Sequence, residues 1–100
     1  MLIHNVYFWA KEGLSDADKA ALGEGLASLC GYELVRSGHS GVPAGTTRDV
    51  VDRSYTFGPV LIFDNQDDQD AYQISPIHRA FVAEHAAKWD RVVVYDVETC

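Results

Sequence analysis

Two histidines and one tyrosine are the side chains of this sequence best suited to acid-base chemistry. His78 follows Ser75, a natural helix N-cap, and Pro76, which suits the first helical position, so it falls in the first turn of a predicted helix. The positive end of a helix disfavours imidazolium, which leaves a neutral imidazole able to accept a proton near pH 7. Tyr72 could donate a hydrogen bond to a carbonyl oxygen that gains negative charge, and His4 could orient either partner.

Each of these residues also has a structural interpretation. Taken singly, His78 is a first-turn helix residue, Tyr72 a core aromatic and His4 a hydrogen-bonded core histidine. The functional interpretation requires the fold to bring all three into one cavity between a sheet and its helices. We name them as candidate catalytic residues on that condition.

Other kinds of site fail on spacing. His78 and His85 are seven positions apart, about 10.5 Å along a helix, and the sequence has no HExxH motif, so we expect neither a metal nor a haem cofactor. Cys30 and Cys100 form no CxxC pair, and we interpret them as free thiols in a reducing cytoplasm. The acidic run 64–70 lacks the glycine and the glutamate of a calcium loop, which favours helix-capping carboxylates.

Composition limits the class of protein. One hundred residues, 47% of them apolar, predict a single globular domain over residues 1–100. The formal net charge is −7 and the eight basic residues are scattered, which argues against binding to nucleic acid or to an anionic membrane. No stretch approaches the roughly 18 apolar residues that span a bilayer, and the N-terminus does not resemble a signal peptide.

The first half of the chain must position His4. Residues 2–9 alternate as a strand that is largely apolar on both faces, with His4 on the same face as Phe8. Ser15 predicts a helix start, Leu22, Leu26 and Leu29 form one stripe, and Gly31 predicts the helix end. Residues 32–40 form a weaker strand candidate, and residues 41–48 have the composition of a loop. Two helix glycines, Gly23 and Gly25, indicate close packing of the helix on the sheet.

The second half must position Tyr72 and His78. Residues 54–63 predict a strand whose Gly58–Pro59 step indicates an edge position or a bulge. A short helix through Tyr72 should end at Ser75, because Pro76 disfavours helical geometry in the residue before it. A second helix should then bury a broad face. Its members are Ile77, His78, Phe81, Val82 and His85.

A last strand, residues 91–97, completes the order strand, helix, strand, strand, broken helix, strand. This order predicts an α+β protein, a ferredoxin-like βαββαβ protomer with a four-stranded, mainly antiparallel sheet. Three strands are apolar on both faces, whereas the helices can cover only one side. We therefore expect a homodimer through sheet-to-sheet packing.

The sequence resembles the stress-responsive dimeric α/β-barrel (Dabb) family over nearly its whole length. The matching residues are His4-x-Val6-x-Phe8 with Lys11, Asp52 to Tyr55, Phe63-Asp64, Ala71-Tyr72, Pro76-x-His78-x-x-Phe81, and Trp89 with Val92, Val94 and Asp96. The resemblance implies a dimer whose sheets close into a barrel. The family includes olivetolic acid cyclase, a cofactor-free cyclase that has the equivalents of His4, Tyr72 and His78. Leu26 stands where that cyclase has a pocket tyrosine, which implies a more apolar pocket, and Ser75 replaces the usual His before Pro76.

These observations predict a cavity in each protomer for a small apolar or phenolic ligand. We expect its wall to include five substrate-binding side chains, Leu26, Phe8, Phe81, Val82 and Trp89. The leading hypothesis is a cofactor-free cyclase, isomerase or lyase in which His78 removes a proton next to a carbonyl. The alternative is a stress-related stability or ligand-binding module without turnover.

Overall fold

The computed structural model describes all 100 residues, which form a four-stranded antiparallel sheet and three α-helices. The strands are β1 (Leu2–Ala10), β2 (Ser37–His39), β3 (Val60–Phe63) and β4 (Trp89–Glu98). The helices are α1 (Asp16–Leu29), α2 (Gln66–Gln73) and α3 (Pro76–His85), and the short 3-10 turn Ala86–Lys88 joins α3 to β4. The strand order β2-β3-β1-β4 confirms the predicted ferredoxin-like fold.

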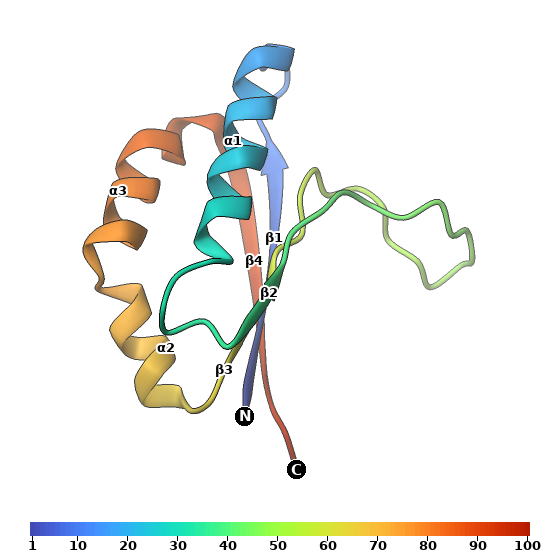
Figure 1. Cartoon of the computed structure of the whole chain (residues 1–100). Coiled ribbons are helices and arrows are strands. Elements are labelled where there is room, and N and C mark those ends of the chain that lie inside the picture. The colour runs from blue at the N-terminus through green and yellow to red at the C-terminus, as the bar shows by residue number, and fades with distance from the viewer.

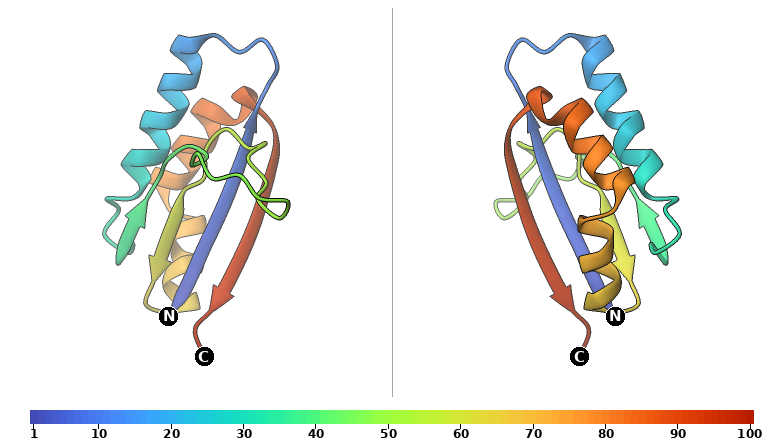
Figure 2. Two further views of the ribbon diagram at one scale, coloured as in Figure 1. Left: turned by 90° about the vertical axis from the view of Figure 1, so that its right-hand side faces the viewer. Right: turned by 90° about the vertical axis from the view of Figure 1, so that its left-hand side faces the viewer.

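All three helices lie on one face of the sheet (Figures 1 and 2). The two-residue period of β1 directs His4, Val6 and Phe8 toward the helices, where all three are buried. From the opposite side, α1 contributes its predicted stripe of leucines to the same core. His4 is therefore a polar residue in an otherwise apolar row beneath the helices.

None of the helices combines the length and the hydropathy needed to cross a bilayer.

The helix starts follow the predicted capping residues. Ser15 accepts a hydrogen bond from the backbone N–H of Asp18, and Ser75 accepts one from that of His78. The acidic run does supply first-turn carboxylates, but α2 already begins at Gln66, with Asn65 as its N-cap. Most of the run is therefore part of the helix that carries Tyr72, and this helix is longer at its N-terminal end than the sequence predicts.

The two middle strands are shorter than predicted. After α1 the chain turns through hydrogen bonds at Tyr32 and Val35, so β2 keeps only three residues. The chain before β3 pairs with β1 through a single bridge, Phe57 to Phe8, in the register of the main ladder. The prediction of an edge strand or a bulge at Pro59 is wrong: β3 is an interior strand, and the Pro59 carbonyl accepts a hydrogen bond from β1 without a register shift.

The buried face of α3 is narrower than predicted. Phe81 and His85 are buried, but Ile77 and Val82 are 39% and 37% exposed. At Gly25, α1 approaches the side of α3 that carries Phe81 and His85, and an added Cβ there would lie 2.7 Å from the His85 Nε2 atom and 3.2 Å from the Phe81 ring. The glycine thus permits close packing as predicted, but here it packs against a helix and not the sheet. Gly23 similarly faces the Phe57 ring.

The face of the sheet opposite the helices is rich in apolar and aromatic side chains. The register places Tyr7 beside Val93 and Asn5 beside Tyr95 on this outer face. The long connection between β2 and β3 extends away from the sheet on this side (Figure 1). Its Tyr55 ring lies 4.9 Å from the Tyr7 ring. No helix covers this face, so Tyr95 is 64% exposed in the isolated chain.

We expect acid to destabilise this fold through His85. Burial lowers the pKa of His85, Lys88 lowers it further, and Glu84 opposes the shift. An unfolded histidine titrates near about 6.5, so the unfolded chain takes up this proton first and the free energy of unfolding falls as the pH drops below that value. Urea unfolding of wild type and His85→Gln between pH 7.5 and 5.5 measures the effect. The substitution should flatten the dependence, and His39→Gln, at an exposed position on β2, should not.

Candidate functional site

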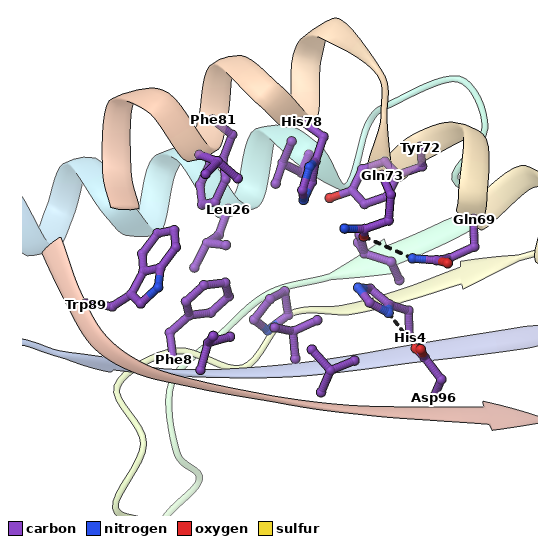
Figure 3. Close-up of a pocket in the computed structure, with 17 residues that line it drawn as sticks. His4, Phe8, Leu26, Gln69, Tyr72, Gln73, His78, Phe81, Trp89 and Asp96 are labelled. Carbon is purple, nitrogen blue, oxygen red and sulfur yellow. Dashed lines mark hydrogen bonds and ion pairs between the residues drawn. The ribbon is translucent and has the colours of Figure 1, made fainter. Parts of the chain in front are cut away.

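A cavity of about 410 Å³ lies between the helices and the sheet (Figure 3). Its wall is formed by side chains from β1, β3 and β4 on the floor and from α1, α2 and α3 on the roof. Figure 3 shows aromatic and aliphatic groups at one end and polar groups at the other. The lining residues are His4, Val6, Phe8, Leu26, Leu29, Pro59, Leu61, Gln69, Tyr72, Gln73, His78, Phe81, Val82, Trp89, Val92, Val94 and Asp96.

His78 and Tyr72 meet at the junction of α2 and α3. Their ring centroids are 4.9 Å apart in an edge arrangement. The buried hydroxyl of Ser75 donates to the Tyr72 carbonyl at 2.7 Å and accepts from the His78 backbone N–H at 3.3 Å. One serine therefore ties the end of one helix to the start of the next and fixes the separation of the two candidate catalytic side chains.

The protonation states of this pair suit a base and a hydrogen-bond donor. Burial lowers the pKa of His78, proximity to His4 adds to the shift, and the Gln73 backbone opposes it. Burial is also the main reason that the pKa of the Tyr72 phenol is raised far above its usual range, with a smaller contribution from Cys30. At neutral pH the imidazole is thus uncharged and the phenol keeps its proton. The sequence predicted a neutral His78 from the helix end, whereas burial is the first cause.

His4 enters the cavity from the sheet. It lies opposite Asp96 in the β1–β4 ladder, and its Nδ1 atom is 2.5 Å from the Asp96 Oδ1 atom. A carboxylate can only accept hydrogen bonds, so Nδ1 donates to Asp96, and Nε2 points toward the cavity (Figure 3). The His4 ring centroid is 6.5 Å from that of Tyr72. The structure therefore brings His4, Tyr72 and His78 to one cavity.

Asp96 is a site residue that the sequence analysis missed as a partner of His4. The two residues are 92 positions apart, and only the strand register aligns them. From Val92 onward the even-numbered residues of β4 share the helix-facing side with those of β1, so alternation combined with a correct pairing of β1 with β4 is the signal that would have found it.

The five predicted wall residues all border the cavity. Phe8 and Trp89 lie with ring centroids 4.8 Å apart, and Phe81 stacks on Trp89 at 5.9 Å with an interplanar angle of 16°. Leu26 is 1% exposed and closes the roof, whereas Val82 is 37% exposed. Phe8, Leu26, Phe81 and Trp89 form the apolar end in Figure 3, and the contact of all five side chains with a substrate stays a prediction.

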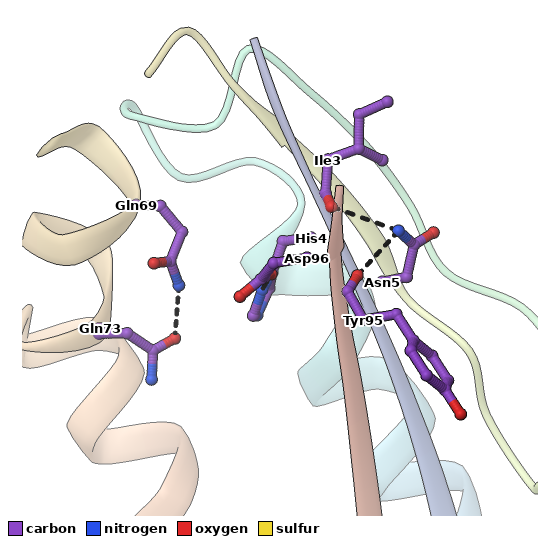
Figure 4. A network of polar contacts seen from close by, with 7 residues as sticks. All are labelled: Ile3, His4, Asn5, Gln69, Gln73, Tyr95 and Asp96. Atoms are coloured by element: carbon purple, nitrogen blue, oxygen red, sulfur yellow. Dashed lines mark hydrogen bonds and ion pairs between the residues drawn. The ribbon is translucent and has the colours of Figure 1, made fainter. Parts of the chain in front are cut away.

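Two glutamines were also missed. Gln69, 7% exposed, donates from Nε2 to the Gln73 Oε1 atom at 3.0 Å, and both side chains line the polar end of the cavity (Figures 3 and 4). The sequence around them is acidic, a composition that by itself indicates only helix capping. A helical period from Tyr72 would have placed Gln69 three residues earlier on the same face.

The remaining polar candidates lie elsewhere. The structure contains no group of three or more His, Cys, Asp or Glu side chains arranged to hold a metal ion. Cys30 is half-buried, Cys100 is exposed, and neither lines the cavity. His85 is buried next to Phe81 and does not line the cavity. Its Nδ1 atom lies within hydrogen-bond distance, 2.9 Å, of the Lys88 Nζ atom.

Comparisons with known proteins agree with this architecture. The sequence model of the family described as the stress responsive A/B barrel domain matches residues 2–99. The sequence has no significant match among curated proteins.

Three solved structures illustrate the likeness in fold. A protein from Arabidopsis thaliana is 22% identical, with a TM-score of 0.82, and the match covers 100% of this chain and 96% of that one. A dimeric ferredoxin-like protein from Thermobifida fusca is 21% identical, with a TM-score of 0.80 and coverage of 98% and 90%. A hydroxynitrile lyase from Passiflora edulis is 19% identical, with a TM-score of 0.78 and coverage of 96% and 90%.

Proposed function

Since this chain belongs to the stress-responsive A/B barrel domain family, we propose that it is a cofactor-free enzyme that removes a proton next to a carbonyl group, with His78 as the base. The observation that carries this proposal is the meeting of His4, Tyr72 and His78 in one cavity. A single buried histidine is commonly structural, whereas a neutral imidazole, a protonated phenol and an oriented second histidine together form an acid-base site. The reaction would be a cyclase, isomerase or lyase step on a small neutral ketone.

The proposed step uses each group once. The His78 imidazole takes the proton from the carbon beside the carbonyl, and the electron pair of the broken C–H bond moves onto the carbonyl oxygen as an enolate. The Tyr72 hydroxyl donates a hydrogen bond to that oxygen as its charge grows. Asp96 holds the His4 ring with Nε2 toward the cavity, where it can accept a hydrogen bond from a polar substituent of the substrate. The apolar end holds the rest of the molecule.

Replacing Tyr72 by Phe is expected to slow the proton-transfer step about 10²-fold, because it removes one hydrogen bond to the developing oxyanion. The phenyl ring keeps its contacts with Phe63 and His78, so we expect the thermal midpoint of unfolding to change little. The rate is measured as α-proton exchange of a simple aryl ketone in D₂O by proton NMR. Tyr32→Phe is the matched control, since that phenol lies outside the cavity lining. Equal rates for wild type and Tyr72→Phe would remove Tyr72 from the proposed mechanism.

A non-catalytic ligand-binding module is the second candidate, and the predominantly apolar lining favours it. A thermal-shift screen with aryl ketones and phenols separates the two functions. The enzyme predicts stabilisation of the wild type followed by proton exchange that His78→Ala abolishes. The module predicts equal stabilisation of both proteins and no exchange above the rate of the buffer. Absence of stabilisation by every compound would contradict both candidates.

We also propose that two protomers pack sheet against sheet as a homodimer. The support lies in the outer face of the sheet, where Tyr95 and Val97 remain 64% and 48% exposed. An apolar face of this kind is rarely left open to water. The Thermobifida fusca protein of the same fold is described as dimeric.

A further inference from the structure

The amide pair of Gln69 and Gln73 has hydrogen-bonding groups left over. The single bond between them uses one N–H of Gln69 and one lone pair of the Gln73 oxygen. Each amide offers two N–H donors and one oxygen acceptor, so both N–H groups of Gln73 and the oxygen of Gln69 remain. Figures 3 and 4 show the pair beside His4, and the Gln73 side chain extends to the exposed mouth of the cavity.

A role in the helix alone does not explain this arrangement. Gln69 is one of two buried residues of α2, and placing an amide there costs more desolvation than an apolar side chain would. A pair that served only α2 would form the same hydrogen bond on the solvent side of that helix without this cost. The remaining donors and acceptor are thus available to a ligand in the cavity.

The charge of the cavity limits the ligand that would use them. No lysine or arginine is among the lining residues, and the one carboxylate, Asp96, is already bonded to His4. A carboxylate or phosphate group would therefore enter without a cationic partner, which is unfavourable. A neutral hydroxyl fits both the donors of Gln73 and the acceptor of Gln69, because it accepts and donates, whereas a carbonyl oxygen could use only the donors.

The order of groups along the cavity places this oxygen within the ligand. Figure 3 shows the apolar end around Trp89, then His78, and then Tyr72 together with the two glutamines. We propose that the Gln69–Gln73 pair binds a second oxygen on the far side of the reacting carbonyl, so that the cavity selects neutral hydroxyketones with an aromatic or aliphatic body. The position of the carbonyl in this inference rests on the proposed function, whereas recognition of the second oxygen is tested by binding alone.

The experiment compares two probes, α-hydroxyacetophenone and propiophenone, which differ only in a hydroxyl for a methyl group. Dissociation constants are measured by NMR titration of wild type, Gln69→Met, Gln73→Met and the exposed control Gln66→Met. A net hydrogen bond predicts that wild type and Gln66→Met bind the hydroxyketone about five- to tenfold more tightly. In Gln69→Met and Gln73→Met this preference should disappear, so that the two probes bind with about equal dissociation constants. If Gln69→Met is unfolded by circular dichroism, Gln73→Met at the cavity mouth decides the outcome.

The possible results separate this inference from the proposed function. Equal affinity of wild type for both probes would overturn the role of the glutamines while leaving the cavity a ketone site. A preference lost in Tyr72→Phe but kept in both glutamine variants would also overturn it, because the hydroxyl would then lie at the reacting end. Failure of wild type to bind either probe would contradict the ligand site itself.

Discussion

The variant His78→Asn is expected to exchange the α-protons of propiophenone about 10²- to 10⁴-fold more slowly than the wild type, the usual contribution of a positioned general base. Asparagine keeps a polar side chain in the first turn of α3, where the Ser75 hydroxyl caps the backbone of residue 78. The change removes the proton acceptor and leaves the helix start and the apolar wall in place. Exchange is followed by proton NMR in D₂O at ketone concentrations below and above saturation.

The pH dependence of the same reaction supplies an independent check. Burial lowers the pKa of His78, so the imidazole stays neutral to a lower pH than an ordinary histidine does. The exchange rate should therefore hold as the pH falls through about 6.5 and decline only below that value. His39→Asn, at an exposed position on β2, should match the wild type throughout. An exchange rate unchanged in His78→Asn would eliminate His78 as the base.

The variant Tyr95→Glu is expected to convert the proposed dimer into monomers, raising the dissociation constant by about 10²-fold or more. Tyr95 lies on the outer face with its ring centroid 6.4 Å from that of Tyr7. Two-fold symmetry would bury two new carboxylates per dimer among aromatic groups, and each unpaired buried charge costs several kcal/mol. Size-exclusion chromatography with light scattering distinguishes a monomer of 11.0 kDa from a particle of twice that mass.

A control with the same change in composition isolates the effect of position. Ile74, at the end of α2, is 65% exposed and lies away from the outer face, so Ile74→Glu should remain dimeric. A wild type that is monomeric at micromolar concentration would contradict sheet-to-sheet pairing. A Tyr95→Glu protein that stays dimeric would place the interface on another surface.

Local signals predicted the elements that carry the candidate catalytic residues. The alternation of β1 placed His4 on the same face as Phe8, and the Ser75–Pro76 step placed His78 in the first turn of α3. These features depend on neighbouring residues and on backbone sterics, which a sequence contains directly. The ferredoxin-like fold followed from the order of such elements.

Features that depend on distant partners were not predictable in the same way. Asp96 reaches His4 only through the pairing of the first strand with the last, and β2 is short because the turn after α1 uses part of the segment. Ile77 was expected to be buried from its spacing along α3, but α1 packs against a different line of that helix. Gln69 lies among acidic residues that face solvent, so the composition of this segment indicates an exposed surface and not the buried position that Gln69 occupies.

Intermolecular nuclear Overhauser effects from bound propiophenone to ¹³C-labelled protein test most directly whether the cavity between helices and sheet is the ligand site. The proposed site predicts contacts from the phenyl group to Trp89 and Phe81 and from the α-protons to the His78 ring. Contacts confined to Tyr7, Tyr55 and Tyr95 on the outer face, or none at saturating ketone, would contradict it.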